Sequence, residues 1–417
     1  MYYIMNSDTQ QCLETVKEIF PRVQEGPLFS EKSRAFLHGL YNKMLISHQS
    51  WTSSNKKWIN SSIRTISSSD FTRSSDYDYM PATIRSSLEE GHKYQKQVRL
   101  KLKGKEYNIL LLKPVQDFTN VSMRKTETFF EQALMKIYMW LNVIHRYGDD
   151  GCSDKMDIYI YFTDYKKSFS NGPNTVPLDE MHVNTAFTTS CMPSTSITIY
   201  REEEWFKVFM HETFHNLGLD FSSFDMTETN KRILDLYPIS APSRGVRLYE
   251  SYCEMWAEML HTLLIAFWKT RDKTNEVLIL SKFEKMFKIE AQFSVFQCVK
   301  ILDYYGLTYT ELIKTNCEMS KKARQKYSEK SHILSYYVVK AALITQPNAF
   351  LEWCIHSTRN GIAFIKTQEH INDYTRLIEY TYTNTLLLHY VQEIETWLKQ
   401  NKRKSMVCTN LRMTLFG

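Results

Sequence analysis

The sequence lacks three features, each of which would assign it to a class of protein. Its 8 cysteines include no C-x-x-C pair and no close spacing, so they do not form the pattern of a small disulfide-stabilised domain. No apolar run reaches the length that a membrane-spanning helix needs. The 52 basic and 46 acidic residues leave a formal net charge of only +6. Nucleic-acid-binding proteins usually concentrate basic residues on one face, so we expect no nucleic-acid partner.

These absences also indicate a compartment. We expect the cysteines to be free thiols in a reducing environment. The segment from Met1 to Asp8 has neither the basic nor the apolar part of a secretory signal, so we expect an intracellular, soluble protein without a membrane partner. The 417 residues are 43% hydrophobic and 14% aromatic, which is enough for one large core or two to three smaller ones.

Hydrophobic spacing predicts three consecutive regions. Residues 1–90 combine a helical pattern with a serine-rich linker from Ser50 to Tyr79. Residues 91–270 alternate between strand and helix patterns and are expected to form a central core of strands and helices. Residues 271–417 repeat helical spacing and are expected to form an all-helical C-terminal lobe.

The expected core begins with a β-hairpin, in which Lys103-Gly104-Lys105 supplies the turn between Val98–Leu102 and Tyr107–Leu112. Its remaining predicted elements are a helix over Met123–Tyr147, a strand over Met156–Phe162, a strand over Ser196–Tyr200 and a helix over Glu202–Leu217.

The last of these helices contains the motif His211-Glu212-Thr213-Phe214-His215. Residues four apart share a helical face, so His211 and His215 can bind one metal ion. Glu212 then lies beside the metal, where a carboxylate can take a proton from an activated water and pass it to a leaving amine. The motif also occurs by chance on solvated helices, so its context decides the interpretation.

The context favours a metal site. The helix is apolar on most sides, so we expect it to be buried, and histidines and a glutamate inside it would be costly without a partner. Gly218 follows at the position of a left-handed helix cap. The apolar residues are Trp205, Phe206, Val208, Phe209, Met210, Phe214 and Leu217.

A catalytic zinc site requires a third protein ligand in addition to a water. The metzincin pattern would place it at Phe221, with Asp220 one residue away, which disfavours that subclass and leaves Asp220 as hydrogen-bonding support. Glu250, Glu254 and Glu258 recur every four residues in a second apolar helical pattern. This spacing suits one glutamate ligand and a neighbouring carboxylate that orients a histidine. A solvent-facing acidic stripe is the alternative.

The two helices resemble the gluzincin group of zincin metallopeptidases, in which a glutamate on a later helix completes the site. The run from Ile199 to His215, joined to Glu250–Glu258, is also similar to metallopeptidases encoded by large cytoplasmic DNA viruses. This resemblance covers Asp179 to Leu264. It implies His211 and His215 as ligands and Glu212 as general base.

The identity of the third ligand stays open between two residues. Glu254 is preferred, because Cys253 and Ala257 beside it are small and let its helix approach the histidine helix; Glu258 or Glu250 then supports it. The alternative register makes Glu250 the ligand and Glu254 its support.

We therefore expect an α+β, mainly helical protein with a zincin-like core, one Zn²⁺ per chain and peptidase activity on a protein or peptide substrate. His182–Phe187 either forms a sheet edge that pairs with substrate or is an ordinary loop. A viral protein in the host cytoplasm, or one associated with virions, is the expected setting. The competing hypothesis is an inactive zincin-fold structural or interaction protein.

Overall fold

The computed structural model describes residues 7–22, 26–54, 61–67, 70–115, 119–169, 177–240, 242, 245–313, 318–401 and 406–417. The chain divides into two compact units that interleave along the sequence. We call residues 39–166 and 185–219 the sheet unit, and residues 1–38, 167–184 and 220–417 the helical unit. The three consecutive regions stay a prediction.

The sheet unit contains a mixed six-stranded sheet in the order β1-β2-β3-β4-β6-β5. The pairs β3–β4 and β4–β6 are parallel, and the other pairs are antiparallel. The strand predictions are confirmed, and β5 forms one edge. The strands are β1 (Arg64–Ile66), β2 (His92–Leu102), β3 (Lys105–Val115), β4 (Lys155–Tyr161), β5 (Ala186–Thr188) and β6 (Ser194–Ile199).

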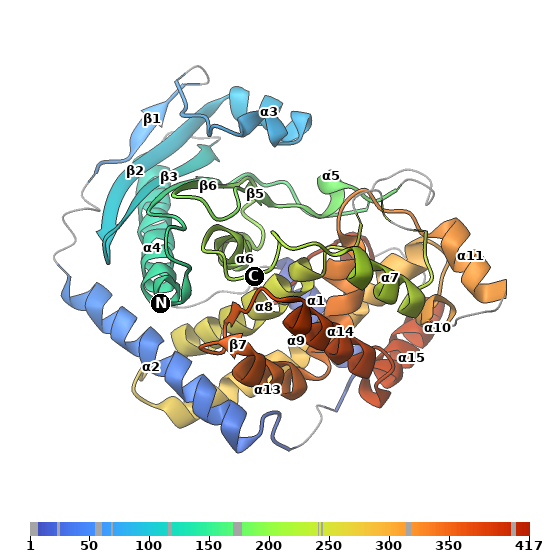
Figure 1. Ribbon diagram of the computed structural model, residues 1–417. Helices are drawn as coiled ribbons and strands as arrows, with labels where there is room; N and C mark the ends of the chain where they lie inside the picture. The colour runs from blue at the N-terminus through green and yellow to red at the C-terminus, as the bar shows by residue number, and fades with distance from the viewer. Residues whose placement is uncertain are drawn as a thin grey trace. The chain divides into compact units, whose positions relative to one another are not determined.

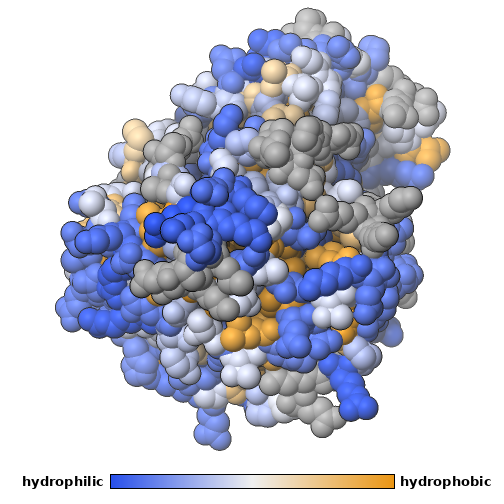
Figure 2. Space-filling model, turned by 90° about the vertical axis from the view of Figure 1, so that its right-hand side faces the viewer, coloured by the Kyte–Doolittle hydropathy of each residue, from blue (hydrophilic) through white to orange (hydrophobic). Residues whose placement is uncertain are grey.

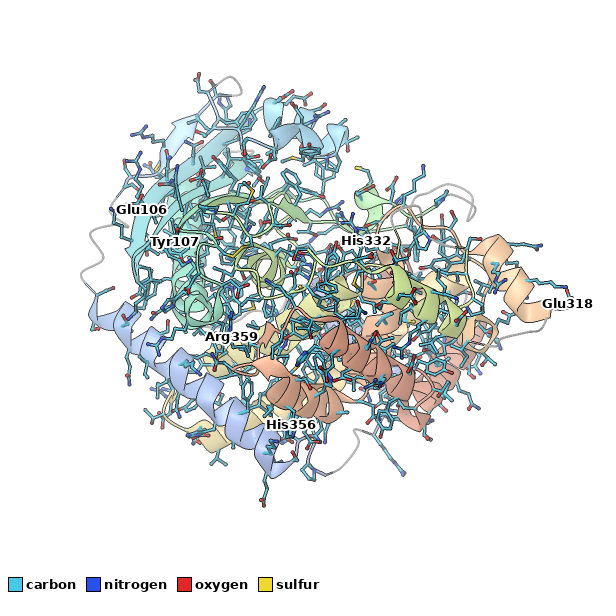
Figure 3. All side chains as sticks on the ribbon, viewed as in Figure 1. Glu106, Tyr107, Glu318, His332, His356 and Arg359 are labelled. Carbon is cyan, nitrogen blue, oxygen red and sulfur yellow. A yellow bond between two sulfur atoms is a disulfide. The ribbon has the colours of Figure 1, made fainter. Side chains whose placement is uncertain are left out.

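The predicted hairpin joins β2 to β3. Lys103 and Gly104 have φ values of 55° and 85°, the positive angles that a two-residue hairpin turn requires at both positions. Side chains then alternate along β3: Glu106 is exposed, whereas Tyr107 is buried (Figure 3).

Different elements cover the two faces of this sheet (Figure 1). Helices α4 (Asn120–Ile144) and α6 (Trp205–Asn216) pack on one face, where α6 contacts β5 and β6. The short 3-10 helix η2 (Tyr77–Tyr79) and α3 (Ala82–Glu89) cover the other face. The core on that side consists of Ile66, Phe71, Tyr77, Met80, Ile84, Leu88, Leu110, Leu112, Tyr161 and Tyr200.

The serine-rich linker is predicted only in part. Helix α2 (Glu31–Ser53) extends into it, and it also contains β1 and η2. Residues 55–60 and 68–69 of this stretch lie outside the described residues. Apolar side chains spaced among the serines, such as Ile66 and Tyr77, hold these elements in the core.

In the helical unit, α8 (Leu248–Lys269) packs against α9 (Glu276–Tyr304), the π-helix η4 (Leu334–Val339) and α12 (Lys340–Ile344). The predicted helices around residues 277–287 and 387–398 are confirmed as parts of α9 and α15. The other helices are α1 (Ser7–Ile19), α5 (Glu180–Val183), α7 (Thr227–Leu236), α10 (Tyr309–Ile313), α11 (Glu318–Lys326), α13 (Pro347–Ser357), α14 (Gln368–Thr381), α15 (Thr385–Gln400) and α16 (Met406–Thr409).

The expectation of an all-helical C-terminal lobe is wrong in one place. A short hairpin pairs β7 (Thr358–Arg359) with β8 (Ala363–Phe364). Asn360 and Gly361 have φ values of 56° and 78°, and Asn-Gly is the strongest short sequence signal for such a turn.

The expectation of free thiols is wrong for one pair, because Cys152 and Cys191 form a disulfide with a Cα–Cα distance of 4.8 Å. The parallel strands β4 and β6 begin side by side, with Lys155 paired to Ser194, and each cysteine lies three residues earlier. Pairing of the strands therefore brings together cysteines that are distant in sequence. Cys317 lies outside the described residues; the free cysteines of the described part are Cys12, Cys253, Cys298, Cys354 and Cys408.

The face drawn in Figure 2 is mainly hydrophilic, with hydrophobic residues in an interrupted patch. Within the described ranges, no helix combines the length and the apolar character needed to span a bilayer.

Candidate metal centre

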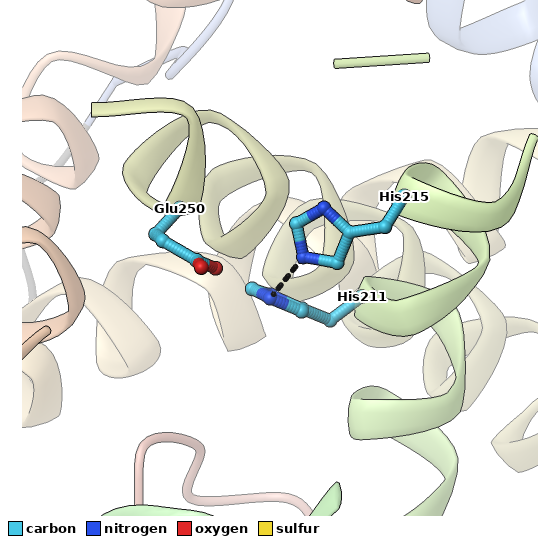
Figure 4. A group of neighbouring side chains, drawn as sticks. All are labelled: His211, His215 and Glu250. Carbon is cyan, nitrogen blue, oxygen red and sulfur yellow. Dashed lines mark hydrogen bonds between the residues drawn. The ribbon is translucent and has the colours of Figure 1, made fainter. Parts of the chain in front are cut away.

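Two histidines of α6 direct the same ring atom toward each other. The Nε2 atoms of His211 and His215 are 3.1 Å apart, and the ring planes are inclined by 72° (Figure 4). Two nitrogens that bind one tetrahedral zinc ion at the usual bond length are separated by roughly 3.3 Å. The pair therefore has the spacing of two ligands of one ion.

The motif lies in a buried helix, as predicted. His211, Glu212 and His215 are 4%, 9% and 8% exposed, and every residue of α6 is buried. Burial makes charge on these side chains costly unless a partner compensates it. A divalent cation is one partner that suits two imidazoles and a carboxylate.

The middle of α6 is held by α4. The indole N–H of Trp140 donates to the hydroxyl of Thr213 at 2.8 Å, and this hydroxyl donates to the carbonyl of Met210 at 2.7 Å. Thr213 is the residue after Glu212, so the hydrogen bond fixes the motif against the core. The helix begins later than predicted, because Glu204 adopts a left-handed φ of 60° before Trp205.

The C-terminal end of α6 has the predicted left-handed cap. Gly218 has a φ of 66°, its N–H donates to the carbonyl of His215 at 3.2 Å, and the N–H of Leu219 donates to Phe214 at 2.8 Å. These two bonds define a Schellman motif, which ends the helix at a fixed residue.

The loop of the disulfide also holds this end. The hydroxyl of Ser153, next to Cys152, donates to the carbonyl of Asn216 at 2.9 Å, and the N–H of Asp149 donates to the carbonyl of Leu217 at 2.9 Å. The Asn216 amide donates to the Thr188 hydroxyl of β5 at 2.8 Å. The residue after His215 is thus bound from two sides.

In the helical unit, the three glutamates of α8 are all buried, so the solvent-facing stripe is excluded. Lys340 lies within 2.6 Å of the Glu258 carboxylate and 3.7 Å of the Glu254 carboxylate, and it also donates to the carbonyl of Met413. Burial favours neutral Lys340, but the two carboxylates outweigh this and raise its pKa. Glu254 and Glu258 thus share one buried cation.

A fourth buried carboxylate extends this cluster. Burial, and then the charge of Glu258, raises the pKa of Glu290 to about 8. Its carboxylate accepts hydrogen bonds from the Thr414 hydroxyl and from the N–H groups of Leu415 and Phe416. The cluster therefore ties α8 and α9 to the segment 413–416.

Asp220 and Phe221, which follow the cap of α6, belong to the helical unit. The Asp220 carboxylate accepts from the Ser222 hydroxyl at 2.9 Å and from the Cys253 thiol of α8 at 3.8 Å. Phe221 is fully buried, and the centroid of its ring lies 4.2 Å from the ring centroid of Phe364. The residue at the metzincin ligand position is therefore part of an apolar core.

The sheet edge expected at His182–Phe187 is confirmed for Ala186 and Phe187. These residues lie in β5 (Ala186–Thr188), which pairs only with β6 among the described strands. His182 lies instead in the short helix α5, where it bonds to the helix-capping Asp179.

Several residues that hold α6 or the glutamates of α8 were not predicted. Lys340 is the sole charged residue in the apolar run from Leu334 to Ile344, and that isolation is the signal that it has a buried partner. Trp140 and Asn216 act through contacts that are distant in sequence, and no local pattern indicates them.

No protein-family model matches the chain, and neither a curated protein nor a solved structure matches it at a significant level.

Proposed function

We propose that this chain is a zinc-dependent peptidase in which His211, His215 and Glu250 bind the metal and Glu212 is the general base. The observation that carries the proposal is the pair of facing Nε2 atoms, 3.1 Å apart, on a buried helix that also bears Glu212. A structural zinc site would need four protein ligands, whereas this set offers three and leaves a position for water.

The preference for Glu250 over Glu254 rests on the charges around α8. Lys340 already forms ion pairs with Glu254 and Glu258. If either glutamate bound the metal ion instead, the buried lysine would lose one of its two carboxylate partners, which is unfavourable. Glu250 lies one turn earlier on the same helix. Figure 4 draws the side chains of His211, His215 and Glu250.

The covalent chain supports the same choice. Asp220 follows His215 by five residues, and its carboxylate bonds to Cys253 of α8. Cys253 is one turn from Glu250 on that helix. The short connection from His215 to Asp220 thus joins the histidine helix to the unit that contains Glu250.

The proposed reaction is hydrolysis of a peptide bond. When bound, a zinc ion would lower the pKa of a water molecule and polarise the substrate carbonyl. The Glu212 carboxylate would take a proton from this water as the water oxygen bonds to the carbonyl carbon, and would transfer the proton to the amine as the carbon–nitrogen bond breaks. The open edge of β5 provides backbone groups that can pair with an extended substrate.

The substitution Glu212→Gln tests the proposal and separates it from the inactive zincin-fold alternative. It removes the base but neither histidine, so the variant should bind about one zinc ion per chain, like the parent, while peptide cleavage falls by several orders of magnitude. Metal analysis and a mixed peptide library measure both. Equal cleavage by parent and variant contradicts the mechanism, and zinc binding without any cleavage by the parent supports the inactive alternative.

A further inference from the structure

The turn formed by η2 presents an exposed aromatic side chain. The Tyr79 side chain is 80% exposed, although its neighbours Tyr77 and Met80 are buried in the core. The turn is held in place, because the Ser196 hydroxyl of β6 donates to the Asp76 carboxylate at 2.9 Å. Tyr79 is therefore an exposed ring on a fixed support.

This ring lies beside the edge strand. The ring centroids of Tyr79 and Phe187 are 6.1 Å apart in an edge-to-face arrangement, and Phe187 in turn packs against the core at Tyr200. Together, Tyr79 and Phe187 form an aromatic pair on the sheet face opposite α6. Thr188, the next residue of β5, faces α6 and bonds to Asn216.

Hydrogen bonding fixes which backbone groups of β5 face outward. Tyr200 N–H donates to the Thr185 carbonyl, and Thr189 N–H donates to the Ser196 carbonyl. Inward pairs recur every two residues in an antiparallel ladder, so Phe187 also pairs inward. The N–H and carbonyl groups of Ala186 and Thr188 then point to the open edge.

An added strand must follow this register. The added strand would form hydrogen bonds with the backbone of Ala186 and Thr188. Its residue opposite Phe187 would point to the same face of the sheet as Phe187, with the two Cβ atoms within about 5.5 Å of each other. The two adjacent residues of the added strand would face the α6 side, which carries the histidines.

We propose that the aromatic pair Tyr79–Phe187 selects substrates with an aromatic or large aliphatic side chain at the one position that lies opposite Phe187. This inference rests on the proposed peptidase function. A contact with an aromatic pair changes binding by up to about tenfold, so the preference should be strong at one position and absent at its neighbours.

The test is cleavage of a mixed peptide library by the zinc-loaded full chain, followed by kinetics on matched peptides with Phe or Ala at the selected position. Tyr79→Ala should lower kcat/KM for the Phe peptide about tenfold and leave the Ala peptide nearly unchanged. Tyr79→Phe keeps the ring and should keep the preference. Val121→Ala removes another exposed apolar side chain, 62% exposed on α4, and is the matched control.

The possible results separate the two proposals. The role of the aromatic pair is contradicted if the parent protein and Tyr79→Ala show the same residue preferences, or if the parent shows no preference at any substrate position. The proposed peptidase function is unaffected by either result. A zinc-loaded parent that cleaves no peptide contradicts both. Loss of cleavage of the Phe and Ala peptides alike in Tyr79→Ala, with unchanged zinc content, also contradicts a role in selectivity.

Discussion

At the scale of single residues, the proposed metal site requires one glutamate of α8 as its third ligand. Sequence spacing favours Glu254, because small residues flank it. The contacts of Lys340 favour Glu250, because they engage Glu254 and Glu258 as a buried ionic cluster. Sequence spacing and the Lys340 contacts favour different residues. Spacing shows only which side chains share a face of α8, whereas Lys340 comes from a helix that is distant in sequence.

Zinc titration of two alanine variants decides between them. Glu250→Ala should lose metal affinity directly, whereas Glu254→Ala should retain it within about 10–100-fold, the usual effect of a supporting residue. Glu254→Ala should also lower the free energy of unfolding, because Lys340 keeps only one buried carboxylate. The opposite order, with parent-like zinc binding in Glu250→Ala, would restore Glu254 as the ligand.

Glu290 gives the helical unit a pH dependence of stability. Its pKa is raised from 4.5 to about 8 by burial and by Glu258, so the folded state binds its proton more tightly than the unfolded state. The free energy of unfolding should therefore fall as the pH rises from about 4.5 through about 8. The N–H groups of Leu415 and Phe416 and the Thr414 hydroxyl favour the charged form and limit the rise of this pKa.

Urea denaturation across this pH range tests the prediction. Glu290→Gln removes the proton-binding group but keeps an acceptor oxygen, so its stability should decline less between pH 5 and pH 8 than that of the parent. The exposed Glu318→Gln is the control and should follow the parent (Figure 3). Parallel curves for parent and Glu290→Gln would show that this carboxyl does not titrate as described.

At the scale of elements, α6 is held by residues outside the motif: Trp140 of α4, Thr188 of β5 and Ser153 of the disulfide loop. These contacts keep both histidines in one geometry, which metal binding requires before the ion arrives. We therefore expect the elements around the motif to contribute to metal affinity without contacting the metal.

The disulfide allows this idea to be tested. Cys152→Ser with Cys191→Ser should lower the free energy of unfolding by about 2–4 kcal/mol, because the cross-link closes a long loop in the unfolded chain. It should also weaken zinc binding, since the loop that bonds to Asn216 and Leu217 is less constrained. Cys408→Ser, at a free cysteine, is the control. An unchanged denaturation midpoint in the double variant would contradict the stabilising role.

Local patterns predicted the individual elements well. The hairpin turn at Lys103-Gly104, the buried helix α6 and its cap at Gly218 follow from hydrophobic period and glycine position. The disulfide, the ionic cluster of Lys340 and the hold of Trp140 on Thr213 depend on pairings distant in sequence. The missed β7–β8 hairpin is different, because Asn360-Gly361 was a readable signal inside a helical pattern.

At the scale of the whole molecule, each unit has a core of its own. The sheet unit buries residues such as Leu110 and Tyr161 between the sheet and η2–α3, and the helical unit packs α8 against α9 and α12. Apolar side chains, and not the proposed metal ligands, make up most of each core. The metal should therefore be required for catalysis and not for folding.

The most direct test of this central claim is removal and return of zinc on one sample, with peptide cleavage and far-ultraviolet circular dichroism measured at each step. Chelation should abolish cleavage while most helical signal remains, and added zinc should restore cleavage. Loss of the helical signal with the metal would make the site structural. Cleavage that persists in the metal-free protein would contradict a zinc-dependent mechanism altogether.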